Sequence, residues 1–377
     1  MTYGNVSMDV MQTSDGASLG AGNASIMKNR LINGACVIDQ RNAGASVTPS
    51  GAPIIQYTLD RWCLSIAQSS KLSVQQNAGS VTPPAGFTNY LGVTSTSAFT
   101  PASTDYFQLI QNIEGFNIAD LGWGTSAAKT VTLSFWVYSS LTGQFGGTIR
   151  NSPNFTYTYP FSFTISSANT WQQVNITIVG PNASQGVWNT TNTTGLQLVF
   201  DMGCGSTFLS TANSWQAGTF AGVTGDTKIV GTSGATFYIT GCQLERGSSA
   251  TGYEYVNYQT SLANCQRYCY TFVGAGGYSS MPLVGFVQAS GNTARLETTF
   301  PVTMRTAPSL TTPAANTIII QGPSGTNYTP TVLALTTSSA QTQSAFVDAT
   351  VSGQANYSCV VFDNNSTASK FIFSAEL

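Results

Sequence analysis

The segment Val131-Thr-Leu-Ser-Phe-Trp-Val-Tyr138 alternates apolar and polar side chains with a period of two residues. It is built from β-branched and aromatic residues, which favour a strand with one buried face. Residues 171–178, 196–200 and 235–240 repeat this pattern, and clusters of Gly, Asn, Ser and Pro separate them. Short strands divided by turn signals predict an all-β chain built as a β-sandwich or jelly roll.

The stretch from 271 to 377 is a second region with strand patterns. Its expected strands are residues 282–288, 295–301 and 357–362, followed by a final strand at 371–377. No internal repeat with a period of roughly 20–50 residues is visible, so a solenoid or propeller is not expected.

One segment between the two regions has the period of a helix. Leu262, Cys265, Gln266 and Cys269 fall at i, i+3, i+4 and i+7, which places them on one helix face. The first 28 residues are small and polar without a sustained period, so they could gain order only against a partner. We therefore expect an extended attachment arm at 1–28, a jelly-roll domain at 29–258, a linker helix at 259–270 and a C-terminal β domain at 271–377.

Charged residues make up 7% of the 377 residues, and the formal net charge is −2. Ordinary soluble domains carry roughly 25% charged residues. Binding to a phosphate backbone needs clustered Lys and Arg, but 13 such residues are spread over the whole chain. Nucleic acid is therefore not an expected partner. Weak charge repulsion also favours association, which predicts an assembled state.

The chain contains no histidine, which removes the commonest general base and metal ligand. Ser-His-Asp and Cys-His triads are impossible, and the 15 acidic residues do not cluster in the sequence. We therefore expect no catalytic residues, no cofactor and a non-enzymatic protein.

Seven cysteines are present, of which only Cys265 and Cys269 are close together. A zinc site usually needs two such pairs or added histidines, so no metal site is expected. Buried free thiols are the simplest interpretation, and they fit assembly in a reducing cytoplasm. The start of the chain has no secretory pattern, and no apolar run reaches the ~18 residues of a membrane span, so membrane insertion is not expected.

Six tryptophans and 16 tyrosines accompany many uncharged polar residues. Aromatic faces stack on sugar rings, and neutral polar groups hydrogen-bond hydroxyls without burying charge, so such a surface suits neutral glycans. Trp136 and Trp171 belong to alternating strands, and we expect both in the core. Trp188 lies in the loop-like segment 186–194 and is the candidate glycan contact.

The opening segment 29–42, followed by 57–62, resembles the start of a jelly-roll module common in phage tail-fibre and minor virion proteins. Segments 131–136, 170–172 and 237–247 match later parts of this module in the same order, and Tyr253-Glu-Tyr255 and Cys265-Gln-Arg-Tyr268 match its exit. The module is similar in plan to carbohydrate-binding β-sandwiches. The resemblance covers about residues 29–270 and implies a surface protein of the virion, often a homotrimer, without catalytic residues.

Two functions follow as expectations. The first is a structural protein of a bacteriophage virion, of the fibre or adhesin type, which contacts glycans on the bacterial surface. The alternative is a capsid decoration or head-fibre protein that docks on the phage shell. In either case residues 1–28 are expected to bind other phage structural proteins. A depolymerase is disfavoured because histidine and clustered carboxylates are missing.

Overall fold

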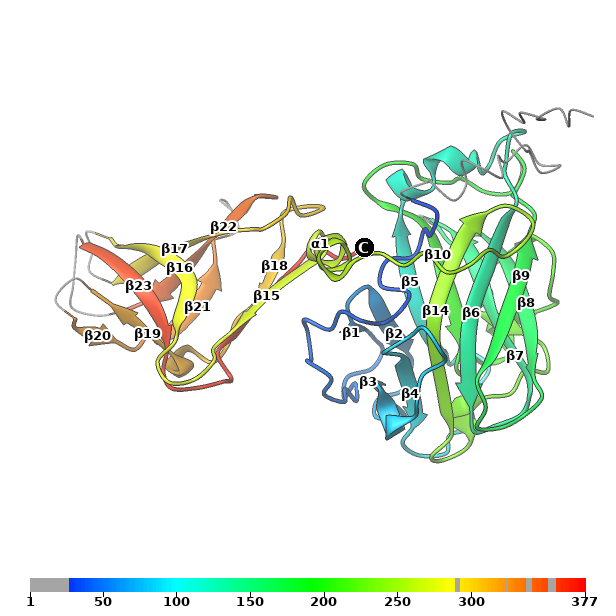
Figure 1. The fold of residues 1–377 in the computed structure, drawn as a ribbon, viewed down its shortest axis with the longest axis horizontal. Coiled ribbons are helices and arrows are strands. Elements are labelled where there is room, and N and C mark those ends of the chain that lie inside the picture. The colour runs from blue at the N-terminus through cyan, green and yellow to red at the C-terminus, as the bar shows by residue number, and fades with distance from the viewer. Residues whose placement is uncertain (1–26, 153, 289–291, 323–324, 337–340, 352–356) are drawn as a thin grey trace, which may run out of the picture. The chain divides into compact units, whose positions relative to one another are not determined.

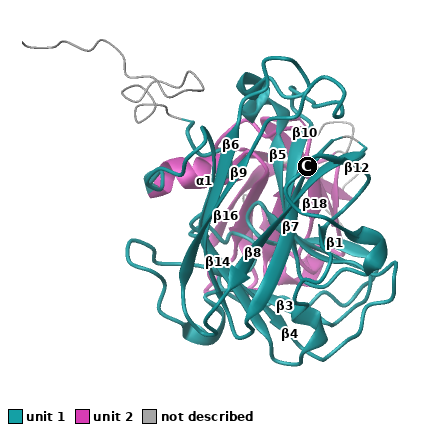
Figure 2. Cartoon of the chain, turned by 90° about the vertical axis from the view of Figure 1, so that its right-hand side faces the viewer, with its two compact units in different colours: residues 1–257, 377 teal, residues 258–376 magenta. Residues whose placement is uncertain are grey.

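The computed structural model describes residues 27–152, 154–288, 292–322, 325–336, 341–351 and 357–377 (Figure 1). Nearly all of its regular structure is β-strand, so the predicted all-β class is confirmed. The chain divides into unit 1, residues 1–257 with Leu377, and unit 2, residues 258–376 (Figure 2). Of the expected attachment arm, residues 1–26 lie outside the described residues.

The described part of unit 1 contains fourteen strands joined by loops and short 3₁₀ helices. The strands are β1 (Ile54–Leu59), β2 (Trp62–Ile66), β3 (Leu72–Gln76), β4 (Leu91–Ser95), β5 (Phe107–Glu114), β6 (Val131–Ser139), β7 (Gly143–Asn151), β8 (Tyr157–Ile165), β9 (Gln172–Ile178), β10 (Thr194–Asp201), β11 (Leu209–Ser210), β12 (Gln216–Ala217), β13 (Gly222–Val223) and β14 (Thr236–Arg246). The 3₁₀ helices are η2 (Ala78–Ser80), η3 (Gly115–Asn117), η4 (Ala119–Leu121), η5 (Ser206–Phe208) and η6 (Ile229–Gly231).

Two antiparallel sheets form the sandwich of unit 1. A seven-stranded sheet has the order β1-β2-β5-β10-β7-β8-β12, and a five-stranded sheet has the order β3-β4-β14-β6-β9. A small parallel pair, β11 with β13, lies in the segment between β10 and β14. The consecutive pairs β1–β2, β3–β4 and β7–β8 are hairpins within one sheet, whereas most other connections cross from one sheet to the other.

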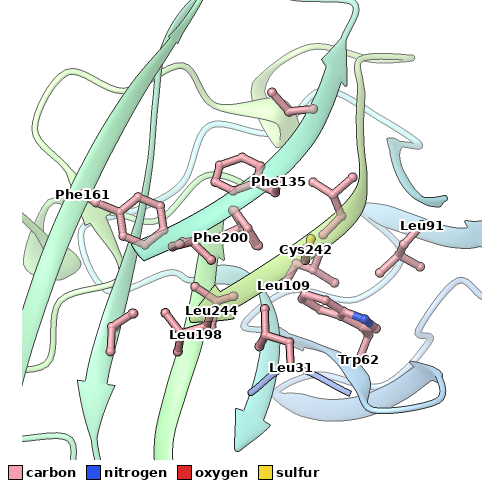
Figure 3. Packing of buried hydrophobic residues seen from close by; sticks show 14 of the residues in the cluster. Leu31, Trp62, Leu91, Leu109, Phe135, Phe161, Leu198, Phe200, Cys242 and Leu244 are labelled. Atoms are coloured by element: carbon pink, nitrogen blue, oxygen red, sulfur yellow. The ribbon is translucent and has the colours of Figure 1, made fainter. Parts of the chain in front are cut away.

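The core of unit 1 lies between the two sheets, because alternate side chains of each strand point inward. Trp62 of β2 and Phe200 of β10 come from the seven-stranded sheet, and Phe135 of β6 comes from the five-stranded sheet (Figure 3). The ring of Phe200 lies 6.4 Å from Trp62 and 5.0 Å from Phe135, measured between centroids. The segment that predicted the fold, residues 131–138, is β6, and its inward side chains belong to this core.

The two tryptophans expected in the core do not lie there. On β6 the side chains of Leu133, Phe135 and Val137 enter the core, so Trp136 points to the opposite face of the sheet. Trp171 precedes β9 and packs with tyrosines outside this core. The error arose because β6 has aromatic residues on both faces, so its apolar content alone did not identify the inward side.

Unit 2 begins with the helix α1 (Tyr258–Gln266), and its other described elements are strands and one 3₁₀ helix, η7 (Ala315–Thr317). The strands are β15 (Cys269–Val273), β16 (Ser280–Val287), β17 (Thr293–Thr299), β18 (Ser309–Thr311), β19 (Ile318–Gln321), β20 (Asn327–Tyr328), β21 (Val332–Leu335), β22 (Ser344–Thr350), β23 (Tyr357–Asp363) and β24 (Lys370–Ser374). A three-stranded sheet, β15-β24-β18, and a seven-stranded sheet, β20-β19-β23-β16-β17-β22-β21, share one hydrophobic core.

The helix is shorter than the expected 259–270. It ends at Gln266, and Cys269 instead starts β15, where it pairs with Ser374 of β24. Cys269 is buried in this strand. The final strand also ends earlier than expected, at Ser374.

All seven cysteines are buried, and none forms a disulfide. Burial raises the pKa of the Cys36 thiol to about 12, which keeps it protonated and unreactive. No helix of the described residues is long and apolar enough to cross a membrane.

Candidate ligand-binding pocket

The outward face of the seven-stranded sheet in unit 1 carries a row of polar side chains. On β5, Leu109 and Ile113 enter the core, so Gln108 and Asn112 point to the other side. The same alternation on β10 directs Gln197 outward. A strand face with this composition is ordinarily solvent-exposed, yet all three amide side chains are buried, because flanking loops cover the sheet.

A pocket of about 440 Å³ opens on this face. Ligand pockets in proteins are typically about 300–1,000 Å³, so this one could hold a small molecule or part of a larger one. It is lined by Ile55, Cys63, Ser65, Tyr106, Gln108, Ile110, Asn112, Arg150, Phe155, Thr194, Gln197, Phe208, Thr219 and Leu377.

The apolar side of the pocket belongs to a small second hydrophobic cluster. Cys63 of β2 and Ile110 of β5 are fully or almost fully buried in it. The rings of Tyr106 and Phe208 pack on this cluster and meet edge to face, with centroids 5.8 Å apart and an interplanar angle of 87°. The pocket therefore combines aromatic surface with amide groups.

Arg150 of β7 lies at the centre of the polar side. Its Nε donates a hydrogen bond to Gln197 Oε1 at 2.5 Å, and its Nη2 donates to Gln108 Oε1 at 3.0 Å. The guanidinium carbon lies 4.8 Å from the ring centroid of Phe155, which is within the range of a cation–π interaction. These three contacts fix the side chain, which is 5% exposed.

The amide groups continue this network across the sheet. Gln197 Nε2 donates to Asn112 Oδ1 at 2.6 Å. Asn112 Nδ2 in turn donates to the main-chain oxygen of Leu377 at 3.0 Å and to the hydroxyl of Tyr57 at 3.1 Å. Each amide is oriented by its neighbours, so the polar side of the pocket is pre-organised.

Arg150 supplies a positive charge to the pocket. Among its lining residues in the described chain, Arg150 alone has a charged side chain. Burial lowers the pKa of Arg150 to about 10, so the guanidinium remains a cation at neutral pH. The nearby Cys204 thiol does not balance this charge, because burial raises its pKa well above the ordinary range and keeps it neutral.

Trp188, the glycan-contact candidate from the sequence, does not offer an open aromatic face. Its side chain is 7% exposed and belongs to the core of unit 1. Its ring meets those of Trp123 and Trp215 edge to face, at centroid distances of 4.8 and 5.4 Å, and its Nε1 donates to Gln185 O at 3.1 Å. The loop folds back on the sandwich because it carries this large apolar side chain among short polar residues.

A second group of aromatic residues lies outside the main core, on the five-stranded sheet. Tyr138 and Tyr238 stack with centroids 5.3 Å apart and an interplanar angle of 5°. Trp171 packs on Tyr138 at 5.5 Å, and its Nε1 donates to Thr82 O at 2.9 Å. Tyr138 and Trp171 are partly exposed, so this tyrosine cluster is the competing aromatic surface of unit 1.

A pair of carboxyl groups is buried in unit 1. Both lie against Gly222, where any side chain would collide with them. Asp201 Oδ1 accepts hydrogen bonds from the main-chain N–H groups of Gly203 and Cys204, both at 2.7 Å. Burial and the neighbouring Asp201 raise the pKa of Asp226 to about 8, although Lys228 Nζ lies 3.5 Å away and opposes the shift.

The described residues contain no group of three or more His, Cys, Asp or Glu side chains that could hold a metal ion. The buried pair Asp201 and Asp226 does not line the pocket. The pocket offers hydrogen bonding, aromatic contact, the positive charge of Arg150 and the main-chain oxygen of Leu377.

No family model matches the chain, and no curated protein matches it. Among solved structures, the enzymatically active domain of tailspike protein 4 from bacteriophage CBA120 is similar at 12% identity and a TM-score of 0.32, covering 58% of this chain and 21% of that one. A CBM4 structure is similar at 16% identity and a TM-score of 0.28, covering 57% and 98%. A family 11 carbohydrate-binding module of Clostridium thermocellum is similar at 13% identity and a TM-score of 0.27, covering 56% and 100%. Likenesses at these TM-scores assign neither a family nor a function.

Sequence reasoning did not identify the pocket residues. Gln108, Asn112, Gln197 and Arg150 occupy the outward positions of strands, which is the pattern of a solvent-exposed face. The available signal was Arg150 itself, an arginine within a strand of a chain that has very few charged residues.

Proposed function

We propose that unit 1 binds a saccharide in the pocket on the outward face of its seven-stranded sheet. The observation that carries this proposal is the pairing of three oriented amide side chains, Gln108, Asn112 and Gln197, with the rings of Tyr106 and Phe208 in one pocket. Amides exchange hydrogen bonds with sugar hydroxyls, and aromatic rings contact the apolar face of a sugar ring.

The test is binding of the purified full chain to a glycan array and to envelope fractions of bacteria. Removing the aromatic wall by Phe208→Ala is expected to weaken saccharide binding by about threefold to tenfold, because one ring contact contributes about 0.5–1.5 kcal/mol. Tyr138→Ala is the matched control, because it removes a ring from the tyrosine cluster on the other sheet. Loss of binding in Tyr138→Ala but not in Phe208→Ala would place the site on the five-stranded sheet instead. No binding to any saccharide would refute the proposed function.

We further propose that the protein is a structural component of a bacteriophage virion, of the fibre or adhesin type, assembled in the host cytoplasm as a homotrimer. The support is the ordered sequence resemblance over residues 29–270 to modules of phage fibre and minor virion proteins. A capsid decoration or head-fibre protein is the alternative, and both place the protein on the virion surface. The proposal includes no catalytic activity.

Labelling the protein in intact particles distinguishes a tail from a head location, and light scattering tests the trimer. A shortened chain that starts at Met27 is expected to keep the melting temperature of the full chain but to fail to join particles that lack the protein. Normal incorporation of this shortened chain would show that attachment does not depend on the arm.

A further inference from the structure

The acceptor oxygens on the polar side of the pocket are already engaged by the protein. Gln108 Oε1 and Gln197 Oε1 each accept a hydrogen bond from Arg150. Asn112 Oδ1 accepts from Gln197 Nε2 at 2.6 Å. The main-chain oxygen of Leu377, which lines the same pocket, accepts from Asn112 Nδ2 at 3.0 Å. These four oxygens therefore each hold at least one donor from the fold.

The guanidinium of Arg150, in contrast, has a free donor. An arginine side chain has five N–H donors in a planar fork. Its contacts to the two glutamines engage Nε and Nη2, and no hydrogen bond from Nη1 to a described residue is formed. Nη1 is also not one of the fully buried polar atoms that lack a partner, so it is accessible from the pocket that Arg150 lines. On this side of the pocket a ligand would therefore bind best through an acceptor oxygen.

An aromatic ring is held beside this donor in an unusual backbone conformation. The guanidinium carbon of Arg150 lies 4.8 Å from the ring centroid of Phe155, and both residues line the pocket. Phe155 has a φ of 49°, in the left-handed region that residues other than glycine seldom adopt. Its main-chain oxygen accepts a hydrogen bond from Thr219 Oγ1 at 3.0 Å. The fold thus places an apolar ring next to the donor despite backbone strain, and such strain is found mainly at ligand sites.

We propose that the saccharide bound in this pocket carries an N-acetyl group, whose carbonyl oxygen accepts a hydrogen bond from the free end of the Arg150 guanidinium while its methyl group packs against Phe155. This inference rests on the proposed function and names its substrate class, namely glycans that contain 2-acetamido sugars. An amide carbonyl accepts hydrogen bonds, and a methyl group is stabilised by leaving water, so one small group matches both neighbouring features of the pocket.

Two other sugar groups match this part of the pocket less well. A hydroxyl group is both donor and acceptor, and the nearest amide oxygens already accept from Arg150. A carboxylate would bring a full charge against apolar lining residues such as Ile110 and Phe208. An N-acetyl group is neutral, so its match to the donor and to the ring does not depend on the balance of charge in the pocket.

The test compares matched neutral probes on the purified full chain. Oligomers of N-acetylglucosamine are paired with cello-oligosaccharides, which have the same linkage but a hydroxyl in place of each acetamido group. Oligosaccharides that contain N-acetylgalactosamine are paired with galacto-oligosaccharides in the same way, and oligogalacturonate is run in parallel as an acidic probe. At least one N-acetylated probe is expected to bind about tenfold to a hundredfold more tightly than its hydroxyl counterpart, which corresponds to the strength of a hydrogen bond to a charged group.

Three variants separate the N-acetyl contact from general binding. Phe155→Gly removes the ring and suits the left-handed backbone, so it should melt close to the wild type and reduce the preference for the N-acetylated probe by about threefold to fivefold. Arg150→Lys keeps a positive charge but not the planar fork, and it should abolish the preference. Phe208→Ala is the matched control, because it removes a different ring of the pocket, which packs on Tyr106. It should weaken binding of both probes alike and leave the preference unchanged.

The outcomes distinguish the two proposals. Equal binding of N-acetylated and hydroxyl probes, tighter binding of oligogalacturonate, or an unchanged preference in Arg150→Lys or Phe155→Gly would overturn the N-acetyl assignment while leaving saccharide binding intact. If Arg150→Lys does not fold, the result for Phe155→Gly decides the assignment. If no saccharide of any kind binds, the proposed function and this inference both fail.

Discussion

Each unit contains a seven-stranded antiparallel sheet with an arginine on the outward face of a strand, and the two arginines have different surroundings. In unit 2, Arg295 of β17 lies directly opposite Asp348 of β22, and its Nε and Nη2 donate to the two carboxylate oxygens at 2.9 and 3.1 Å. Both side chains of this pair are partly exposed. In unit 1, Arg150 is buried and contacts neutral amides.

The sheet face that carries Arg295 is partly exposed, whereas the face that carries Arg150 is covered and contains a pocket. The sheet of unit 2 neutralises its arginine across neighbouring strands and leaves apolar side chains such as Phe286 exposed. Loops cover the outward face of the unit 1 sheet, and the hydrogen-bond partners of its arginine are amide oxygens. Because burial makes a charge costly, a buried arginine held by neutral amides in a pocket is a stronger indication of ligand binding than an exposed, paired one.

Removing part of the core that supports the seven-stranded sheet of unit 1 should have the largest effect on stability and on binding. Phe200 lies on β10 with Gln197 but points inward, and its side chain is fully buried. Phe200→Ala is expected to destabilise unit 1 by about 3–5 kcal/mol and to abolish binding in the pocket. Phe373→Ala removes an equally buried ring from unit 2 and should cost a similar amount while preserving binding. Calorimetry combined with a binding assay checks both variants; binding retained in Phe200→Ala would mean that the core does not position the pocket.

The next effect is a pH dependence of opposite sign in the two units. The pKa of Asp226 is raised to about 8, whereas a carboxyl in an unfolded chain titrates near about 3.9. The folded state therefore holds this proton more tightly, so its stabilising contribution is full below about pH 4 and decreases until about pH 8. In unit 2, a hydrogen bond from Arg295 lowers the pKa of Asp348. The stabilising contribution of Asp348 is therefore present above about pH 4 and is lost on acidification.

Asp226→Asn tests the first of these two dependences. An amide carries no charge at any pH, so the variant should melt higher than the wild type at pH 8–9 and close to it at pH 4. Melting curves recorded across this range provide the measurement. If the melting temperatures of the wild type and the variant changed with pH in parallel, Asp226 would not be the group that causes the pH dependence.

Much of the fold could be predicted because alternation with a period of two follows directly from strand geometry. The alternation over residues 131–138 predicts a strand, and β6 occupies Val131–Ser139. The boundaries of the helix were not predicted, because Cys269 continues the helical period but pairs with β24 instead. Local periodicity cannot anticipate a partner strand that lies about a hundred residues later in the chain.

The pocket was not predictable in the same way. Alternation indicates which side chains point outward, as it does for Gln108 and Gln197, but it does not show that a distant loop will cover them. The prediction for Trp188 was wrong about exposure for a related reason. Its loop composition suggested solvent contact, whereas the indole packs against Trp123 and Trp215, which are distant in sequence.

The smallest expected effect concerns the paired arginine of unit 2. Arg295 and Asp348 are partly exposed, so solvent screens their attraction and ordering two long side chains offsets part of the gain. A double-mutant cycle with Arg295→Gln, Asp348→Asn and the combined variant should give a coupling energy of about 0.2–1 kcal/mol in urea unfolding at pH 7. The coupling should vanish as the pH falls through the titration of Asp348, whereas Arg295→Gln should leave saccharide binding unchanged. A coupling above about 2 kcal/mol would mean that the unit 2 pair behaves as a buried one, and the contrast between a screened, paired arginine and the buried Arg150 would then lose its physical basis.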